Sequence, residues 1–188
     1  MNDEANTPDL SDEEVLVRAS QGDSEAFGVL YERYVKRIYN YIYYRTGHTF
    51  EAEDLTARVF QRAINHIGNY RNIGVPFSAW LYRIAHNLVA NWYRDNQRRQ
   101  EVPLENTSEL EYKSDHPEST LVHTQDMEKL LKHIRSLPPD RQQLIILKFE
   151  EKLPNTEIGL IMGRSEGAIK SLYHRTLLVL REELEKED

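Results

Sequence analysis

Apolar residues recur at steps of three and four through most of this chain, and this spacing restricts its secondary structure more than any other feature. No segment shows the sustained alternation of apolar and polar residues that is typical of a half-buried strand. Glycine, proline and polar capping residues divide the periodic stretches into separate helices. The sequence therefore predicts an all-α fold.

Four helices are expected within residues 1–100. Ser11 and Glu14 form a capping box for the first, and Thr49 is expected to cap the third. The fourth presents apolar residues from Phe77 onward and becomes basic toward Arg94. Four helices with one apolar face each are expected to pack as a bundle. The other boundaries are expected at Gly22, Asp23, Gly47 and Gly68.

Residues 101–126 separate this bundle from a second helical part. They contain Pro103 and Pro117, seven acidic residues and little periodicity, which predicts an acidic flexible linker. The chain is therefore expected to form two small helical domains, residues 1–100 and 127–188, on either side of the linker.

The second domain ends in two helices with the spacing of a helix-turn-helix. Asn155 is expected to cap the first, Gly163 and Arg164 to form the turn, and Ser165 to cap the last. We expect the last helix to bury Ile169, Leu172, Tyr173, Leu177, Leu180 and Leu184.

With that face buried, the polar face of the last helix is free to enter a DNA major groove. Its donors are expected to contact base edges and phosphates, although a solvated charged face on a plain helical domain remains an alternative. The candidate residues are Arg164, Ser165, Glu166, Lys170, Ser171, His174 and Arg175.

A second candidate surface combines aromatic and basic residues between positions 70 and 99. Aromatic rings stack on unpaired bases at about 1 to 3 kcal/mol each, while arginines hold the backbone. Aromatic residues at helical spacing also build cores, so we expect Trp80, Leu81, Ile84 and Leu88 to be at least partly buried. The set comprises Tyr70, Phe77, Trp80, Tyr82, Trp92 and Tyr93 among Arg71, Arg83, Arg94, Arg98 and Arg99.

The net charge of -7 hides alternating blocks of opposite sign. Residues 1–25 and 101–126 are strongly acidic, residues 26–100 are basic, and residues 127–188 are neutral overall. A basic patch that faces DNA phosphates is thus compatible with a negative net charge for the whole protein. The acidic segments should weaken non-specific DNA binding, because they repel the phosphates.

Four segments that carry these patterns resemble the extracytoplasmic-function (ECF) sigma factors of the sigma-70 family in order and spacing. They are EAEDLTARVFQRA (51–63), FSAWLYRIAHNLVANWYR (77–94), LPPDRQQLIILKF (137–149) and EGAIKSLYHRTLLVLREEL (166–184). The resemblance implies a region 2 domain that binds core RNA polymerase and the minus-ten promoter element. It also implies a region 4 helix-turn-helix domain that binds the minus-thirty-five element. Such a protein directs transcription initiation and DNA melting in response to a stress or signal.

The resemblance also implies partners and residue roles. The partners are promoter DNA, the β′ clamp and β flap of core polymerase, and an anti-sigma factor. The residues implied to bind core polymerase are Asp54, Leu55, Thr56, Val59, Phe60 and Ala63. Those implied to bind minus-ten DNA are Arg71, Asn72, Phe77, Trp80, Arg83, Asn87, Asn91 and Arg94. The helix-turn-helix residues above are implied to bind the minus-thirty-five element.

Four positions depart from the family pattern. Ala57 and Arg58 stand where a polar residue and an acid are frequent, so the charge pairing of the core contact is expected to differ. Leu172 replaces a frequent arginine, which shifts the expected DNA contact to neighbouring cations. Gly159 replaces an alanine, at an expected cost of up to about 1 kcal/mol of helix propensity.

Other classes of function have little support in the sequence. It contains no cysteine, phosphate-binding glycine loop, nucleophile elbow or histidine pair at metal spacing, so no enzyme, cofactor, metal or small-molecule substrate is expected. An acidic start without an apolar run predicts a cytoplasmic protein without membrane insertion. The alternatives are an autonomous helix-turn-helix regulator that binds a palindromic operator, and a protein that only sequesters another factor.

Overall fold

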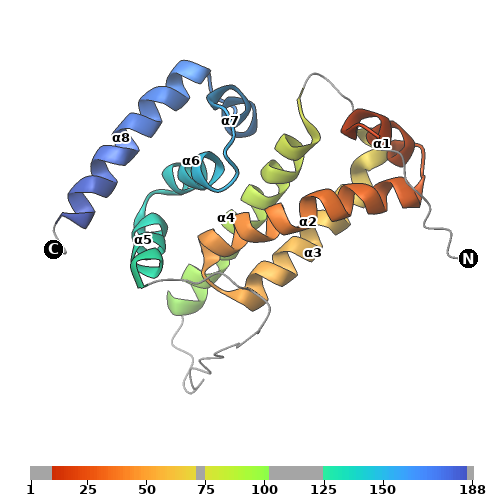
Figure 1. The fold of residues 1–188 in the computed structure, drawn as a ribbon. Coiled ribbons are helices and arrows are strands. Elements are labelled where there is room, and N and C mark those ends of the chain that lie inside the picture. Colours follow the sequence, from red (N-terminus) through yellow and green to blue (C-terminus); the bar gives the residue numbers. More distant parts are fainter. Residues whose placement is uncertain (1–9, 71–74, 102–124, 186–188) are drawn as a thin grey trace, which may run out of the picture.

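The computed structural model describes residues 10–70, 75–101 and 125–185, and these ranges form helices without any strand. Most of the expected linker lies outside them. The all-α prediction is confirmed for the described ranges (Figure 1). The helices are α1 (Asp12–Ser20), α2 (Ser24–Thr46), α3 (Thr49–His66), the 3-10 turn η1 (Ile67–Asn69), α4 (Phe77–Glu101), α5 (Gln125–Ser136), α6 (Pro139–Phe149), α7 (Asn155–Met162) and α8 (Glu166–Leu184).

Helices α1 to α4 form an N-terminal bundle in which α2 contacts each of the other three. The residues at helical spacing on α2, α3 and α4 meet in one core, as the sequence predicts. Each fully buried leucine or isoleucine contributes about 1.5 to 3 kcal/mol relative to an exposed one. The fully buried core residues include Leu30, Ile38, Ile42, Leu55, Leu81 and Leu88.

Several helix ends of the bundle match the expected capping residues. The Ser11 and Glu14 capping box is present, and the Asp23 carboxylate accepts hydrogen bonds from the first N–H groups of α2. Gly47 ends α2 in a left-handed conformation with φ 75°. Thr49 was expected as the cap of α3 but is its first residue, because His48 occupies the N-cap position.

The first helix is fastened to the bundle by polar contacts as well as apolar packing. Asp12 Oδ1 accepts a hydrogen bond from Arg33 Nη1 at 2.7 Å, and Asp12 Oδ2 accepts one from the Tyr34 hydroxyl. Burial and the Asp12 carboxylate both raise the pKa of Tyr34 above its ordinary range. These contacts fix α1 against the N-terminal half of α2.

Helices α5 to α8 form a C-terminal domain that contains the expected helix-turn-helix in α7 and α8. Gly163 takes the left-handed conformation, φ 66°, that the turn requires. Ser165 caps α8 by accepting a hydrogen bond from Ala168 N at 3.2 Å, as expected. Asn155 does not cap α7: Pro154 holds the N-cap position, and Asn155 Oδ1 instead accepts from Lys148 Nζ at 3.0 Å.

The inward face of α8 differs in part from the expected set. Leu177 and Leu184 are 37% and 39% exposed, so their expected burial is wrong. Thr176 is fully buried in place of Leu177, and its hydroxyl is satisfied by a 2.8 Å hydrogen bond to the carbonyl of Leu172. A buried hydroxyl with a backbone partner carries little cost, so threonine can occupy this apolar face.

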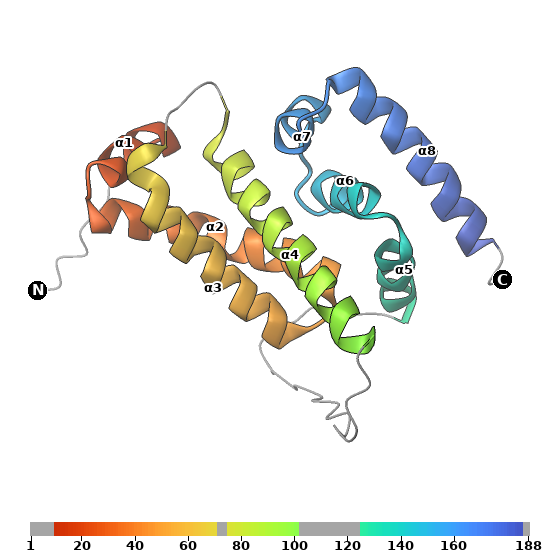
Figure 2. The same cartoon turned by 180° about the vertical axis from the view of Figure 1, so that it is seen from behind.

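The two domains pack against each other, with α4 against α7 and α2 against α5 and α6 (Figures 1 and 2). Helix α8 lies on the far side of the C-terminal domain from α4. The support helix of the helix-turn-helix therefore faces the N-terminal bundle, while the last helix faces outward.

Two searches of the described ranges were negative. No helix in them is both long and apolar enough to cross a membrane. No three histidine or acidic side chains in them are placed to share a metal ion.

Candidate nucleic-acid and polymerase interfaces

Helix α8 and the turn before it present a continuous exposed polar surface. All seven residues expected to contact the minus-thirty-five element are exposed. Leu172 is buried at 9% exposure and faces the core, so it is not part of this surface. The expectation that the neighbouring cations take over its contact is compatible with this geometry. The exposed residues are Arg164, Ser165, Glu166, Lys170, Ser171, His174 and Arg175.

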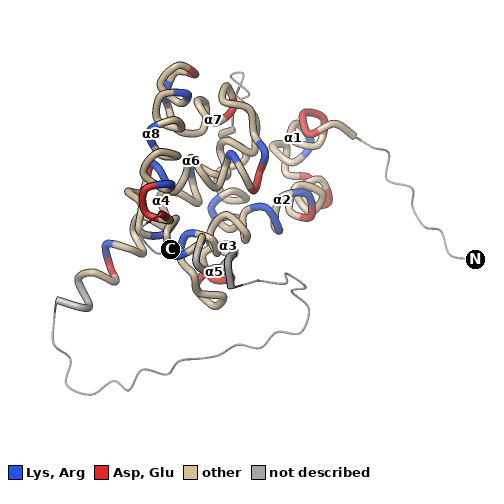
Figure 3. Tube along the Cα trace, turned by 60° about the vertical axis from the view of Figure 1, so that its left-hand side comes forward, with Lys and Arg blue, Asp and Glu red and all other residues tan. Residues whose placement is uncertain are grey.

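The cations of this surface have intramolecular partners. Lys170 Nζ lies 2.7 Å from Glu166 Oε1, and Arg164 pairs with Asp140 of α6. Along α8, the acidic Glu166 at the start of the helix is followed by the basic residues Lys170, Arg175 and Arg181 (Figure 3). Exposed pairs of this kind contribute at most about 1 kcal/mol, so a DNA phosphate can replace the carboxylate.

A polar stripe on α4 forms the second surface. Arg83, Asn87 and Arg94 are exposed, and Asn91 is half-buried. They follow steps of three and four residues, so they lie along one face of the helix. Arg94 Nη2 donates to Asn91 Oδ1 at 2.8 Å. The structure thus brings four of the eight expected minus-ten residues into one stripe.

The aromatic residues at the start of α4 belong mainly to the core. Phe77 is 3% exposed and packs edge-on against Tyr34 and Tyr70. A base cannot stack on a ring covered in this way, so the expected direct contact of Phe77 is corrected to a packing role. Trp80 is half-buried beside Tyr70, with ring centroids 5.2 Å apart. Arg71 and Asn72 lie outside the described residues.

The expected core-polymerase residues of α3 need a similar correction. Asp54 is exposed, but the other five lie in the bundle core because they form the apolar stripe of α3. Arg58 Nη1 approaches Asp54 Oδ2 at 3.5 Å on the outer face. Helical periodicity could have identified this outer face as the complement of the stripe. Buried are Leu55, Thr56, Val59, Phe60 and Ala63; exposed are Glu53, Asp54, Ala57, Arg58, Gln61, Arg62 and Ile64.

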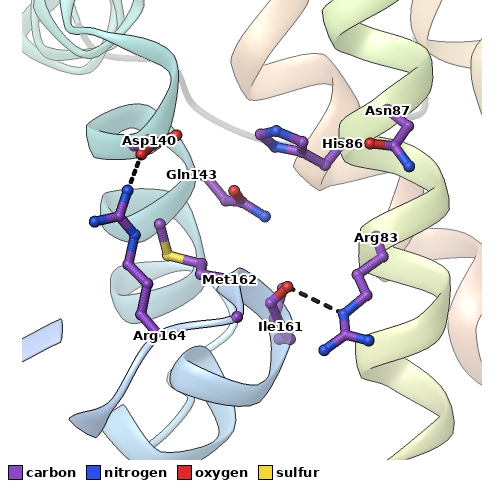
Figure 4. A pocket seen from close by; sticks show the side chains of 9 residues that line it. Arg83, His86, Asn87, Asp140, Gln143, Ile161, Met162 and Arg164 are labelled. Atoms are coloured by element: carbon purple, nitrogen blue, oxygen red, sulfur yellow. Dashed lines mark hydrogen bonds and ion pairs between the residues drawn. The ribbon is translucent and has the colours of Figure 1, made fainter. Parts of the chain in front are cut away.

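The α4 stripe and the turn of the helix-turn-helix line one pocket between the domains (Figure 4). The pocket has a volume of about 380 Å³. Arg83 and Asn87 enter it from α4, and Arg164 enters from the turn. No local sequence pattern indicates this proximity, because the two segments lie far apart along the chain.

One chain thus carries a helical bundle and a helix-turn-helix domain, and each of the two has an exposed polar stripe. The sequence profile of the family Sigma-70 region 2 matches residues 30–99, and that of Sigma-70, region 4 matches residues 127–180. The chain belongs to the sigma-70 family of RNA polymerase sigma factors, and within it to the ECF group.

Curated relatives support this assignment. The chain is 38% identical over 167 residues to the ECF RNA polymerase sigma factor BldN of Streptomyces coelicolor, a match that covers 89% of this chain and 63% of BldN. It is 32% identical to the RNA polymerase sigma factor YlaC of Bacillus subtilis, over 84% of this chain and 91% of YlaC. It is 30% identical to the ECF sigma factor SigW of the same organism, over 90% and 94%.

Solved structures agree in fold. CnrH, in complex with the cytosolic domain of CnrY, superposes with a TM-score of 0.72 at 18% identity, covering 94% of this chain and 99% of CnrH. The sigma factor RpoE of Bartonella quintana, in complex with the anti-sigma factor NepR, gives 0.66 at 21% identity over 85% and 96%. Sigma factors are generally not enzymes, so the family is consistent with the expectation from the sequence that no enzyme is present.

Proposed function

We propose that this chain binds core RNA polymerase and directs it to promoters with two spaced elements, which its two domains recognise separately. The observation that carries this proposal is the presence, on one sigma-70 chain, of two exposed polar stripes on separate helical domains. Two weak DNA-binding modules gain avidity when a partner holds them at a fixed spacing, and polymerase would supply that spacing. The chain contributes recognition and no catalytic step.

The α4 stripe is assigned to the minus-ten element. Arg83 and Arg94 are placed to hold the phosphate backbone, and Asn87 and Asn91 to reach bases. Trp80 is only half-buried and is assigned to an unpaired base, whereas the buried Phe77 packs against it, with ring centroids 5.6 Å apart. Arg71 and Asn72 remain part of the proposed minus-ten surface on the resemblance to the family alone.

Helix α8 is assigned to the minus-thirty-five element in the major groove. Lys170 and Arg175 supply cationic donors, and Glu166 supplies an acceptor for a base amino group. Ser165 already caps the helix with its hydroxyl, so its role is to fix the helix start. Arg164, Ser171 and His174 complete the exposed surface.

The outer face of α3 is assigned to the core polymerase clamp. Its exposed side chains combine acidic and basic residues with the apolar Ile64, which is 48% exposed. The buried residues of α3 hold this face in place and do not touch the partner directly. Asp54 and Arg58 are the charged residues we assign to the contact.

An anti-sigma factor is the proposed regulator, and the cytoplasm the proposed location, where polymerase and promoter DNA are present. CnrH and RpoE were each solved in complex with a second protein, which in the RpoE case is an anti-sigma factor. Such a partner would cover surfaces of this chain that polymerase or DNA otherwise occupies.

In vitro transcription tests the proposal directly. Core RNA polymerase is incubated with a genomic promoter library, with and without the full chain, and start sites are mapped by sequencing. We expect new start sites that share two spaced upstream boxes. The double variant Asn87→Ala/Asn91→Ala should lose preference at the downstream box only, and Lys170→Ala/Arg175→Ala should weaken use of the upstream box.

A matched control separates recognition from general damage. The double variant Glu182→Ala/Glu185→Ala changes two residues near the end of α8, outside both proposed DNA surfaces, and should preserve every start site. An absence of new initiation, combined with binding of the free protein to a palindrome, would instead establish the autonomous regulator.

A further inference from the structure

The pocket between the two domains contains a buried amide that lacks a hydrogen-bond partner. Gln143 of α6 is 4% exposed and lines the pocket. Its side-chain amide forms no hydrogen bond with any other residue that the structure describes. Buried polar side chains are nearly always paired, so an unpaired one that faces a cavity marks a place where a bound group would supply the partner.

His86 of α4 lines the same pocket from the other domain, and one of its ring nitrogens is already engaged. His86 Nδ1 lies 3.1 Å from Nη1 of the fully buried Arg45. A guanidinium only donates, so Nδ1 accepts and the proton of the neutral ring is on Nε2. Burial and the charge of Arg45 lower the pKa of His86, which favours this neutral ring. The Nε2–H group is therefore left as a donor for a group in the pocket.

These two polar groups enter the pocket from opposite sides, next to an apolar wall. Figure 4 shows the imidazole of His86 extending from α4 toward α6, and the amide of Gln143 extending from α6 toward α4. Ile161 and Met162 line the pocket beside them. The pocket thus combines a few convergent polar groups with apolar surface, as small-molecule sites do.

Two arginines give the pocket a positive lining. Arg83 donates through Nε and Nη2 to the carbonyls of Ile161 and Leu160, and Arg164 pairs through Nη2 with Asp140 (Figure 4). A guanidinium has N–H groups on all three of its nitrogens, so both arginines retain donors on Nη1. The two arginines outnumber the single carboxylate of the lining, so the pocket attracts an anionic group.

We propose that this pocket is a binding site for a nucleoside monophosphate. The base edge bonds to Gln143 and His86 and packs on Met162, while the phosphate lies at Arg83 and Arg164. A glutamine amide can bond to an adenine edge through two hydrogen bonds at once. The volume of about 380 Å³ is at the low end for small-molecule pockets and suits a single nucleotide. The site goes beyond the proposed function, because neither Gln143 nor His86 is assigned to DNA or polymerase.

Isothermal titration calorimetry of the full chain tests this site, with AMP and GMP as the probes. We expect one nucleotide to bind per chain. Adenosine lacks the phosphate and inorganic phosphate lacks the base, so each fills only one half of the site. Both should bind weaker than AMP by roughly tenfold or more. These titrations of the parent chain do not depend on the folding of any variant.

Gln143→Met removes the amide but keeps an unbranched side chain of similar length. An apolar side chain in place of an unpaired buried amide should not disturb the fold, which circular dichroism verifies. The variant should weaken AMP binding by roughly fivefold to tenfold, the loss expected for one hydrogen bond. Gln21→Met, at an exposed glutamine that follows α1, is the matched control and should bind AMP as the parent does.

Nuclear magnetic resonance locates the nucleotide in the parent chain. The side-chain amide signals of Gln143 are identified by their absence in Gln143→Met, and they should shift during titration with AMP. No binding of AMP or GMP at millimolar concentration would overturn the proposal, because the pocket would then hold only water. Binding that leaves the Gln143 signals and the affinity of Gln143→Met unchanged would also overturn it, since the nucleotide would lie elsewhere. Inorganic phosphate that binds as tightly as AMP would reduce the site to a plain anion site and refute the nucleotide assignment.

Discussion

Replacing Gly159 by alanine adds one methyl group at the point where α7 meets the turn of the helix-turn-helix. Helix propensity alone predicts a gain of up to about 1 kcal/mol. The geometry instead predicts a loss of stability, because a Cβ at Gly159 would lie 2.6 Å from the carbonyl oxygen of Arg164. That oxygen belongs to the backbone and cannot rotate away as a side chain would. The turn itself must move.

The magnitude follows from the two opposing effects. Overpacking a closely packed site costs typically 1 to 3 kcal/mol, and the propensity gain offsets about 1 kcal/mol of this cost. We therefore expect Gly159→Ala to lower the free energy of unfolding of the C-terminal domain by up to about 2 kcal/mol. The displaced turn carries Arg164 and Ser165, so minus-thirty-five binding should weaken as well.

Urea unfolding followed by circular dichroism measures the change, with separate transitions fitted if the domains unfold independently. Gly167 provides the matched control, since it lies in α8 with no atom within 4 Å of an added Cβ. Gly167→Ala should raise stability by about 0.5 to 1 kcal/mol. A Gly159→Ala variant at least as stable as the parent would show that the turn accommodates the methyl group and that the reasoning is wrong.

Three further substitutions test other features. Arg45 is fully buried with no carboxylate in ion-pair distance among the described residues, and only its Nη1 is satisfied, by the Tyr41 hydroxyl at 2.9 Å and by His86. Arg45→Met should raise the free energy of unfolding by about 1 kcal/mol, and a loss would show that the bonds of Nη1 outweigh the cost of the buried charge. A hydrogen bond from the Ala26 N–H, and next in size one from Arg18, lowers the pKa of Asp23 in the folded protein. The ionised carboxylate therefore stabilises the fold above pH 3.8, and this stabilisation is lost as pH falls through the lowered pKa. Asp23→Asn should flatten this acid dependence of the unfolding free energy in urea titrations. Lys170→Ala should reduce the salt slope of promoter binding by about one, measured by fluorescence anisotropy.

Local sequence patterns predict the helices because each helix carries its own periodicity and many of its own caps. Ser11, Asp23 and Ser165 cap the expected helices, since their side chains bond to N–H groups two or three residues away. Asn155 fails as a cap because a distant group, the Lys148 ammonium, competes for its oxygen. A pattern that spans three residues contains no information about such a competitor.

Side-chain roles were harder to predict than helices. The family motif on α3 includes core residues such as Leu55 and Val59 together with the exposed Asp54, so it does not separate packing from contact. Phe77 fits an aromatic DNA surface in the sequence but is covered by Tyr34 from another helix. The docking of the two domains depends on pairs such as Arg37 and Glu151, 114 residues apart, which no local pattern can connect.

Helix α4 contributes one face to the bundle core and its polar stripe to both the proposed minus-ten surface and the domain contact. An inherited change at Arg83 that alters the proposed promoter contact therefore also removes its hydrogen bonds to the carbonyls of Ile161 and Leu160 on α7. Promoter preference and domain packing cannot be varied independently at that position. Relatives that differ at this position should consequently differ in both properties, unless a second substitution on α7 compensates.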